Sequence, residues 1–331
     1  MSEKGKKNVF GLAARGIAMG AADIIPGVSG GTIAFITGIY EELLATISGL
    51  NFGLIKTWRK EGFRAMWEQG NFRFLVALFS GIIISIASLA VLIEHLLEAY
   101  PIQLWSFFFG LIIASVWLVG KTVEEWNVKT ILGLLGGTAA AYLISVMGPS
   151  EDSANLLYIF ICGSIAVCAM ILPGISGSFI LVLLGAYAAV LGAVSNLLSA
   201  LKASNWDLVF TNILTLVVFV AGCLVGLISF SRLLNWLFKK AHNLTIAVLT
   251  GFLIGSLNKI WPWKQTLEYR IKHEGEINEE LIPVLQKNIS PSEFTTLFDA
   301  PNHFWSGLIL AGLGILLIVL LERFGNAKKA I

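Results

Sequence analysis

The chain carries the sequence Pro26-Gly27-Val28-Ser29-Gly30-Gly31 and, 147 residues after its first proline, the sequence Pro173-Gly174-Ile175-Ser176-Gly177. Each motif interrupts a long apolar stretch, 9–50 in the first case and 153–201 in the second. The proline ends the preceding helix, and the glycines permit a sharp turn and close backbone approach. Each stretch is therefore predicted to be a broken hairpin of two short helices that returns to its starting side.

The composition is that of an integral membrane protein. Of 331 residues, 56% are hydrophobic and 13% are charged, and the mean hydropathy is +0.80. Soluble domains have about 25% charged residues. This composition excludes a soluble enzyme, a nucleic-acid-binding module and a disordered scaffold. The net charge of +2 names no acidic partner, and the three cysteines lie in apolar stretches with no spacing typical of a metal site.

Charge-free runs of 18 to 24 residues indicate the membrane-spanning helices, because about 20 apolar residues cross a bilayer core. The runs are 74–93, 99–120, 130–150, 208–231, 241–258 and 300–321. We therefore predict an all-α polytopic membrane protein, with six full spans and two broken, re-entrant hairpins in one transmembrane domain over 1–325.

The basic residues predict the orientation. With the N-terminus and C-terminus in the cytoplasm and each hairpin returning to its own side, 17 basic residues lie inside and 6 outside. This is the asymmetry that the positive-inside rule expects. The six outer residues are Lys202, Lys259, Lys264, Arg270, Lys272 and Lys287. The polar segment 263–301 is placed outside, as a solvated connector or as a lid.

The two halves of the chain repeat each other. Gly16 matches Gly163, and Tyr40 matches Tyr187, at the same offset of 147 as the two motifs. One returning hairpin and three crossings separate the copies, so the second copy enters from the opposite face. We predict an inverted repeat of 9–150 and 153–325, an arrangement typical of secondary transporters, and we expect the two broken segments to meet midway through the bilayer.

The breaks are candidate anion sites. A helix restarts near Gly31 and near Ser178, and its free N–H groups and positive dipole end suit a phosphate. Serine and threonine hydroxyls add donors, although the serines also suit a purely structural role as helix caps. The predicted substrate-binding residues are Arg15, Pro26, Gly27, Ser29, Gly30, Gly31, Thr32, Pro173, Gly174, Ser176, Gly177 and Ser178.

Only the first copy is ionisable. Arg15, Asp23, Glu41 and Glu42 align with Cys162, Met170, Ala188 and Ala189. An ionisable group in a membrane segment is a functional candidate. Asp23 lies three residues before the break and Glu41 near the end of the returning helix, so both are candidates for ion coupling. The alternatives are an interfacial anchor for Arg15, a structural hydrogen bond for Asp23, and interfacial solvation for Glu41 and Glu42.

The two motifs, with Ala22-Asp23-Ile24-Ile25 before the first, resemble those of the bacterial PopT-type polyprenyl-phosphate (undecaprenyl-phosphate) translocases, formerly a membrane domain of unknown function. The resemblance spans roughly residues 10–325. It implies a protein of the bacterial inner membrane that returns undecaprenyl phosphate, the lipid carrier of peptidoglycan and cell-wall assembly, from the outer to the cytoplasmic leaflet. The implied partners are the lipid and the membrane. The oligomeric state stays open.

Moving this anion inward opposes the membrane potential. The cost is about 2.3 kcal/mol per charge per 100 mV, and a phosphate monoester carries about −1.5 to −2 charges. Coupling to H⁺ or Na⁺ is therefore expected, with no other cofactor and no metal site. Asp23, with Glu41, is the candidate carrier of a coupling proton.

Two other functions fit parts of the sequence. Both motifs contain G-x-S-G, the setting of an intramembrane serine hydrolase, but no histidine lies in a charge-free core to act as the base. A lipid phosphatase would need clustered histidine, arginine and aspartate, which are missing. A transporter of a small soluble anion stays open, because the same loops would serve it.

Overall fold

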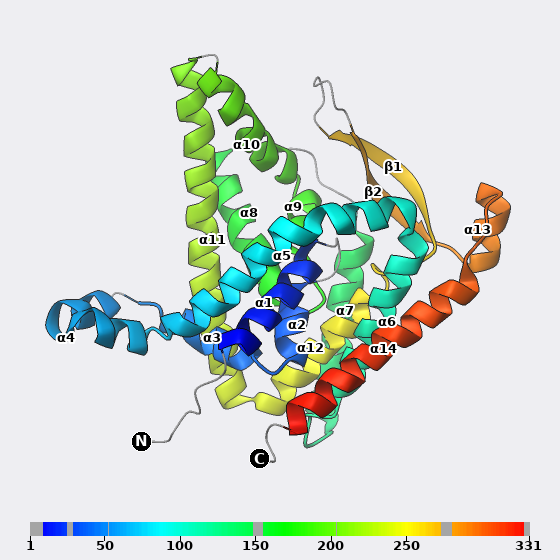
Figure 1. Ribbon diagram of the computed structural model, residues 1–331, viewed down its shortest axis with the longest axis horizontal. Coiled ribbons are helices and arrows are strands. Elements are labelled where there is room, and N and C mark those ends of the chain that lie inside the picture. Colours follow the sequence, from blue (N-terminus) through cyan, green and yellow to red (C-terminus); the bar gives the residue numbers. More distant parts are fainter. Residues whose placement is uncertain are drawn as a thin grey trace.

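The computed structural model describes residues 9–24, 29–51, 53–147, 155–202, 204–272 and 280–327. Most of these residues are helical (Figure 1). The helices of the first half are α1 (Val9–Ile24), α2 (Gly30–Ile36), α3 (Tyr40–Gly49), α4 (Gly53–Gln69), α5 (Phe72–Ala99), α6 (Pro101–Gly120) and α7 (Val128–Val146). Those of the second half are α8 (Leu156–Ile171), α9 (Gly177–Leu183), α10 (Tyr187–Lys202), α11 (Trp206–Lys240), α12 (His242–Ser256), α13 (Pro291–Phe298) and α14 (Phe304–Ala327).

The six predicted spans correspond to α5, α6, α7, α11, α12 and α14. Helices α5, α6, α7 and α11 are long and apolar enough to cross a membrane, while α8, α12 and the apolar part of α14 are shorter. The prediction of a helical, multi-pass membrane protein is confirmed. Helix α11 continues well past the predicted end at 231, because a first charge does not end a helix and Lys239 and Lys240 favour its C-terminal turn.

Each predicted hairpin consists of three helices and not two, which corrects the sequence analysis. Beyond the motif break, a second break follows the seven-residue helices α2 and α9. It is centred on Gly38, with φ of +69°, and on Gly185, with φ of +67°. Glycine adopts this left-handed conformation without steric cost. Glu41 and Glu42 consequently begin α3, where acidic side chains favour the helix dipole, and do not end the returning helix. Re-entry into the membrane stays a prediction.

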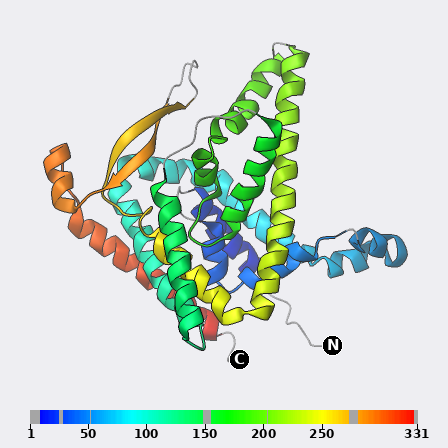
Figure 2. The same ribbon diagram turned by 180° about the vertical axis from the view of Figure 1, so that it is seen from behind.

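The helices pack in four main pairs, two within the halves and two between them. Helix α1 packs on α5, and its counterpart α8 packs on α11. Helix α6 packs on α14 of the second half, and its counterpart α12 packs on α7 of the first (Figures 1 and 2). The cross-half pairs join the two halves through a common core.

Glycines set the close approach in all four pairs. A Cβ atom on Gly16 would collide with the carbonyl oxygen of Leu78, and one on Gly222 with that of Phe160. Across the halves, Gly110 and Gly137 meet the backbone of the partner helix in the same way. Small residues let membrane helices approach closely enough for extensive van der Waals contact.

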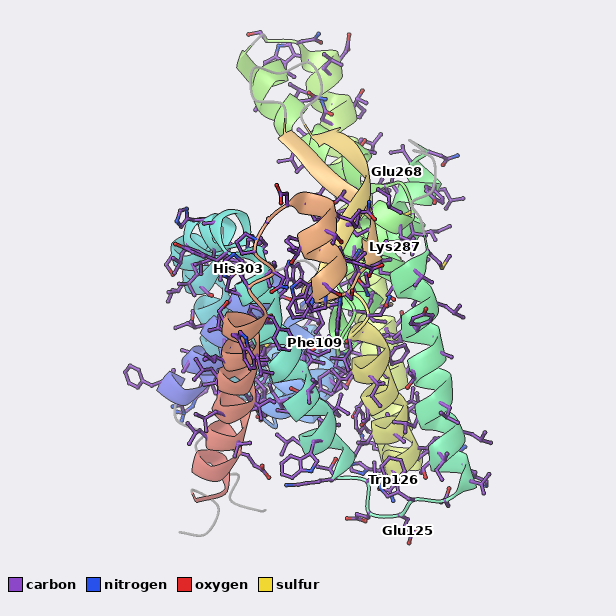
Figure 3. The ribbon with its side chains drawn as sticks, turned by 90° about the vertical axis from the view of Figure 1, so that its right-hand side faces the viewer. Phe109, Glu125, Trp126, Glu268, Lys287 and His303 are labelled. Atoms are coloured by element: carbon purple, nitrogen blue, oxygen red, sulfur yellow. The ribbon has the colours of Figure 1, made fainter. Side chains whose placement is uncertain are left out.

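The polar segment is folded. It contains an antiparallel hairpin of β1 (Lys264–Lys272) and β2 (Glu280–Asn288), followed by α13. The sequence analysis did not predict these strands. Trp261 Nε1 donates to the carbonyl oxygen of Ile289 at 2.9 Å, which fixes the base of the hairpin. In Figure 3, Glu125 and Trp126 lie at the lower end of the molecule, and Lys287 and Glu268 lie well above them.

Candidate anion site

The two motif regions contact each other directly. The Ser29 hydroxyl donates to the carbonyl oxygen of Met170 at 3.0 Å, and the Gly174 backbone N–H donates to Thr32 Oγ1 at 2.9 Å. Ser29 and Thr32 are both fully buried. The sequence analysis expected the two broken elements to meet, and in the structure the start of α2 lies against the end of α8 and the loop that follows it.

In the first motif, protein groups already occupy the N-terminal donors of α2. Ser29 Oγ accepts from the Gly31 N–H at 3.1 Å, so the serine caps the helix. The Gly30 N–H donates to Asp23 Oδ1 at 2.7 Å. The Asp23 carboxyl group thus takes the position in which an external anion would meet this helix end. Pro26 and Gly27 lie outside the described residues.

The second motif has no such carboxyl group, because Met170 occupies the position equivalent to Asp23. Gly174 has φ of +85°, and a Cβ atom there would lie 2.8 Å from Ser256 Oγ, so a larger residue does not fit. Ser176 Oγ caps α9 through a long 3.5 Å contact with the Phe179 N–H. It also lies 2.9 Å from the hydroxyl of Ser178, an exposed residue.

Pro173 and Gly177 frame this loop. Pro173 is buried directly after α8, where it prevents the helix from continuing. Gly177 is the first residue of α9, and a Cβ atom there would lie 2.7 Å from the Ala166 carbonyl oxygen. Both residues therefore pack the loop closely between α8 and α9.

Two further predicted site residues lie apart from this contact. Arg15 precedes Asp23 by eight residues on α1, which is about 12 Å along a helix axis. Glu41 is exposed, and its Oε1 lies 3.4 Å from His242 Nε2. Among the described residues, no hydrogen bond or ion pair joins Arg15 or Glu41 to Asp23.

Two adjoining cavities border the second motif. The smaller, of about 20 Å³, is lined in part by Gly174, Ser176 and Ser145 and has room for about one water molecule. The larger has a volume of about 290 Å³, close to the lower end of the range of about 300–1,000 Å³ for ligand pockets. Ser145 and Lys259 line both cavities.

The larger cavity is basic. Lys259, Lys264 and Lys287 line it, together with Tyr142 and the amides of Asn258, Gln286 and Asn288. The sequence analysis missed these lysines as site residues. Their assignment to the outer side could have indicated such a site, since these three lysines are half of the six basic residues placed there. Among the described residues, no group of three or more histidine, cysteine or acidic side chains is placed to hold a metal ion.

Comparison with known proteins gives consistent matches. A family described as undecaprenyl phosphate translocase-like matches residues 19–278. A Vibrio cholerae protein named polyprenyl-phosphate transporter is 45% identical over 319 residues, which cover 96% of this chain and 98% of that protein. A Staphylococcus aureus protein of the same name is 32% identical over 260 residues, or 75% of this chain and 84% of that protein. No solved structure matches the chain.

Proposed function

Because this chain belongs to the undecaprenyl phosphate translocase-like family, we propose that it returns undecaprenyl phosphate from the outer to the cytoplasmic leaflet of the bacterial inner membrane. Both relatives are named as polyprenyl-phosphate transporters, and those names point to transport and not to hydrolysis. In this proposal the lipid tail stays in the bilayer, and only the charged head group needs shelter across about 30 Å of hydrocarbon.

One observation carries the proposal for the site: the two broken segments touch, and the second borders a polar cavity. We place the phosphate between the loops, with Ser176 and Ser178 of the second loop as donors and the Gly30 N–H of the first loop as a further donor once Asp23 releases it. Irregular backbone in a membrane domain leaves N–H and C=O groups that must be hydrogen-bonded by protein or must line a polar cavity. A phosphate that passes between the loops would bind to these polar groups of the two loops.

Asp23 suggests how the head group couples to a proton. A phosphate and an ionised Asp23 would compete for the Gly30 N–H, and two anions so close repel each other. Protonation of Asp23 removes this charge and weakens its hold on the N–H. The phosphate then binds together with a proton. Such coupling would offset the electrical cost of inward transport, about 2.3 kcal/mol per charge per 100 mV.

The inverted repeat supplies access from both sides. The exchange of helix pairs between the halves supports this part of the proposal, since α6–α14 and α12–α7 are equivalent pairs under the sequence repeat. In an inverted repeat, equivalent segments face opposite sides of the membrane. We accordingly propose that the two halves rock around the Thr32–Gly174 contact, with both termini in the cytoplasm.

Reconstitution tests the function. Purified protein in liposomes should move a polyprenyl phosphate between leaflets much faster than protein-free liposomes, as measured by loss of the lipid from a reagent confined to one side. Release of inorganic phosphate in the same vesicles should stay at background. Phosphate release that depends on Ser29 and Ser176 would instead indicate a hydrolase. Uptake of inorganic phosphate without lipid movement would indicate a transporter of a soluble anion.

A further inference from the structure

We propose that Lys259, Lys264 and Lys287 form a capture site for a phosphate monoester at the outer face, above the second motif. This inference rests on the proposed function for the lipid, and it adds a second, separate position at which the head group binds. It also gives a role to the folded polar segment, whose first and last strand residues supply part of the site.

The cavity brings together residues that are distant in sequence. Lys259 follows α12, Lys264 begins β1, and Lys287 lies near the end of β2, while Ser145 of α7 completes the wall. The hairpin base is held in place because Asn288 Nδ2 donates to the Asn258 carbonyl oxygen at 2.8 Å. The lysines are therefore positioned by a fixed part of the fold.

Lys264 is held in one orientation. Its Nζ donates to the Lys259 carbonyl oxygen at 2.6 Å and lies 3.9 Å from the centre of the Trp105 ring. An ammonium group has three donors, so two stay available for a ligand. Contact with an aromatic face stabilises the cation, but it provides no counter-charge.

Lys259 connects the cavity to the motif. Its Nζ lies 4.1 Å from the centre of the Phe179 ring, and Phe179 belongs to the first turn of α9, whose cap is Ser176. Lys259 also lines the small cavity beside Gly174 and Ser176. Since that cavity holds about one water molecule, the phosphate would bind first in the larger cavity and reach the serines after a movement of the loop.

Lys259 and Lys264 have no ion-pair partner within the described part of the chain, whereas the charge of Lys287 acts on the carboxylate of Glu293. Burial lowers the pKa of Lys259, and burial together with the charge of Lys259 lowers the pKa of Lys264 to about 7. Burial and mutual repulsion therefore disfavour the charged forms of Lys259 and Lys264. A bound phosphate dianion would stabilise both charged forms.

The site belongs to one side only. The run 110–115 of α6 matches the run 251–256 of α12 at an offset of 141, and at this offset Lys259 and Lys264 correspond to Leu118 and Val123 in the first half. The inner face therefore has no equivalent pair in this repeat position. An outer site fits a protein that collects a scarce lipid phosphate from the outer leaflet.

Binding measurements test the site. The probes are a short-chain isoprenyl monophosphate, the matching isoprenol and inorganic phosphate, with detergent-purified full-length protein. The variant K259Q/K264Q should bind the monophosphate at least tenfold more weakly than the unchanged protein. The control K239Q removes the same kind of charge from an exposed position in the last turn of α11 and should bind normally. Isoprenol should bind weakly to all three proteins.

A second measurement does not depend on how the variants fold. In sealed proteoliposomes of the unchanged protein, a membrane-impermeant amine reagent should modify Lys264 and Lys259 from the outer side, and isoprenyl monophosphate should protect them. Protection by inorganic phosphate at similar concentration would show that the site recognises the free anion as well as the lipid head group.

The outcomes separate this inference from the proposed function. If polyprenyl phosphate is transported, but neither protection nor weaker binding in K259Q/K264Q is found, the capture site is wrong and the function stands. If the lysines bind monophosphate but no lipid crosses the membrane, the site stands and the proposed function is wrong. Equal affinity for isoprenol and its monophosphate would also overturn the capture site.

Discussion

Thr32 joins the two halves of the chain through one hydrogen bond from the Gly174 N–H. Thr32→Val keeps the shape of the side chain but leaves this buried donor without its acceptor, which costs about 1–3 kcal/mol. We predict a lower midpoint of thermal unfolding and slower lipid movement. Thr32→Ser keeps the hydroxyl and is the matched control. Equal stability of the valine and serine variants would show that this bond does not hold the halves together.

Asp23 provides the sharpest test of proton coupling. Asp23→Asn keeps an oxygen that can accept from the Gly30 N–H, but it cannot take up a proton. We therefore predict a folded protein whose lipid movement no longer responds to a pH gradient across proteoliposomes. Glu41→Gln serves as a comparison, since Glu41 lies beside His242 and away from this contact. A full pH-gradient response in Asp23→Asn would remove Asp23 from the coupling mechanism.

The pKa of Lys264 predicts that phosphate binding is accompanied by proton uptake or release that depends on pH. With a pKa of about 7, Lys264 is mostly neutral at pH 8 and mostly charged at pH 6. A bound phosphate favours the charged form and raises the pKa. Binding at pH 8 should therefore take up a proton. At pH 6 the lysine is already mostly charged, and the phosphate, whose second pKa is about 6, should release up to about half a proton on average.

Calorimetry in buffers of different ionisation enthalpy measures this exchange. K264R replaces the lysine with a group that stays charged, so proton uptake at pH 8 should fall in this variant. The other described ionisable groups that line the cavity are Lys259, Lys287 and Tyr142. Unchanged uptake in K264R would assign the proton to one of these groups.

The elements differ in how far the sequence predicts them. The motif breaks were predictable because a proline and several glycines act together there. The second breaks were not, because Gly38 and Gly185 are single glycines in apolar surroundings, and a single glycine is common inside membrane helices. The strand β1 had a usable signal that was overlooked, since Leu267, Tyr269 and Ile271 alternate with polar residues.

At the α7–α12 interface, we predict that substitutions of two adjacent glycines, Gly136 and Gly137, differ in their effect on stability. A side chain on Gly137 would collide with the Val248 carbonyl oxygen, whereas a Cβ atom on Gly136 has nothing within 4 Å. Gly137→Leu should separate the helices and lower stability by about 1–3 kcal/mol or more. Gly136→Leu should be tolerated. Thermal unfolding of both variants in the same detergent measures the difference, and equal loss would place the α7–α12 contact elsewhere.

At the scale of the molecule, the sequence predicted the features that occur in both halves, but it did not predict the cavity that residues from separate elements form together. The paired motifs and the expected meeting of the broken segments follow from one chain compared with itself. The lysine cavity could not be derived in this way, because it collects residues from α7, the end of α12, and both strands. Only the three-dimensional fold brings those positions together, and no spacing along the chain records it.

The orientation of the whole molecule provides the final prediction. In Figure 3, Glu125 lies at the lower end of the molecule and Lys287 well above it, and the proposed topology puts Lys287 outside and Glu125 in the cytoplasm. In a chain with its three cysteines replaced, Lys287→Cys should react with an impermeant thiol reagent in intact cells, and Glu125→Cys only after permeabilisation. Arg59→Cys on α4 should behave like Glu125→Cys, because the first hairpin returns to its own side. Labelling of Arg59→Cys in intact cells would mean that residues 9–50 cross the membrane once. This result would exclude the predicted inverted repeat.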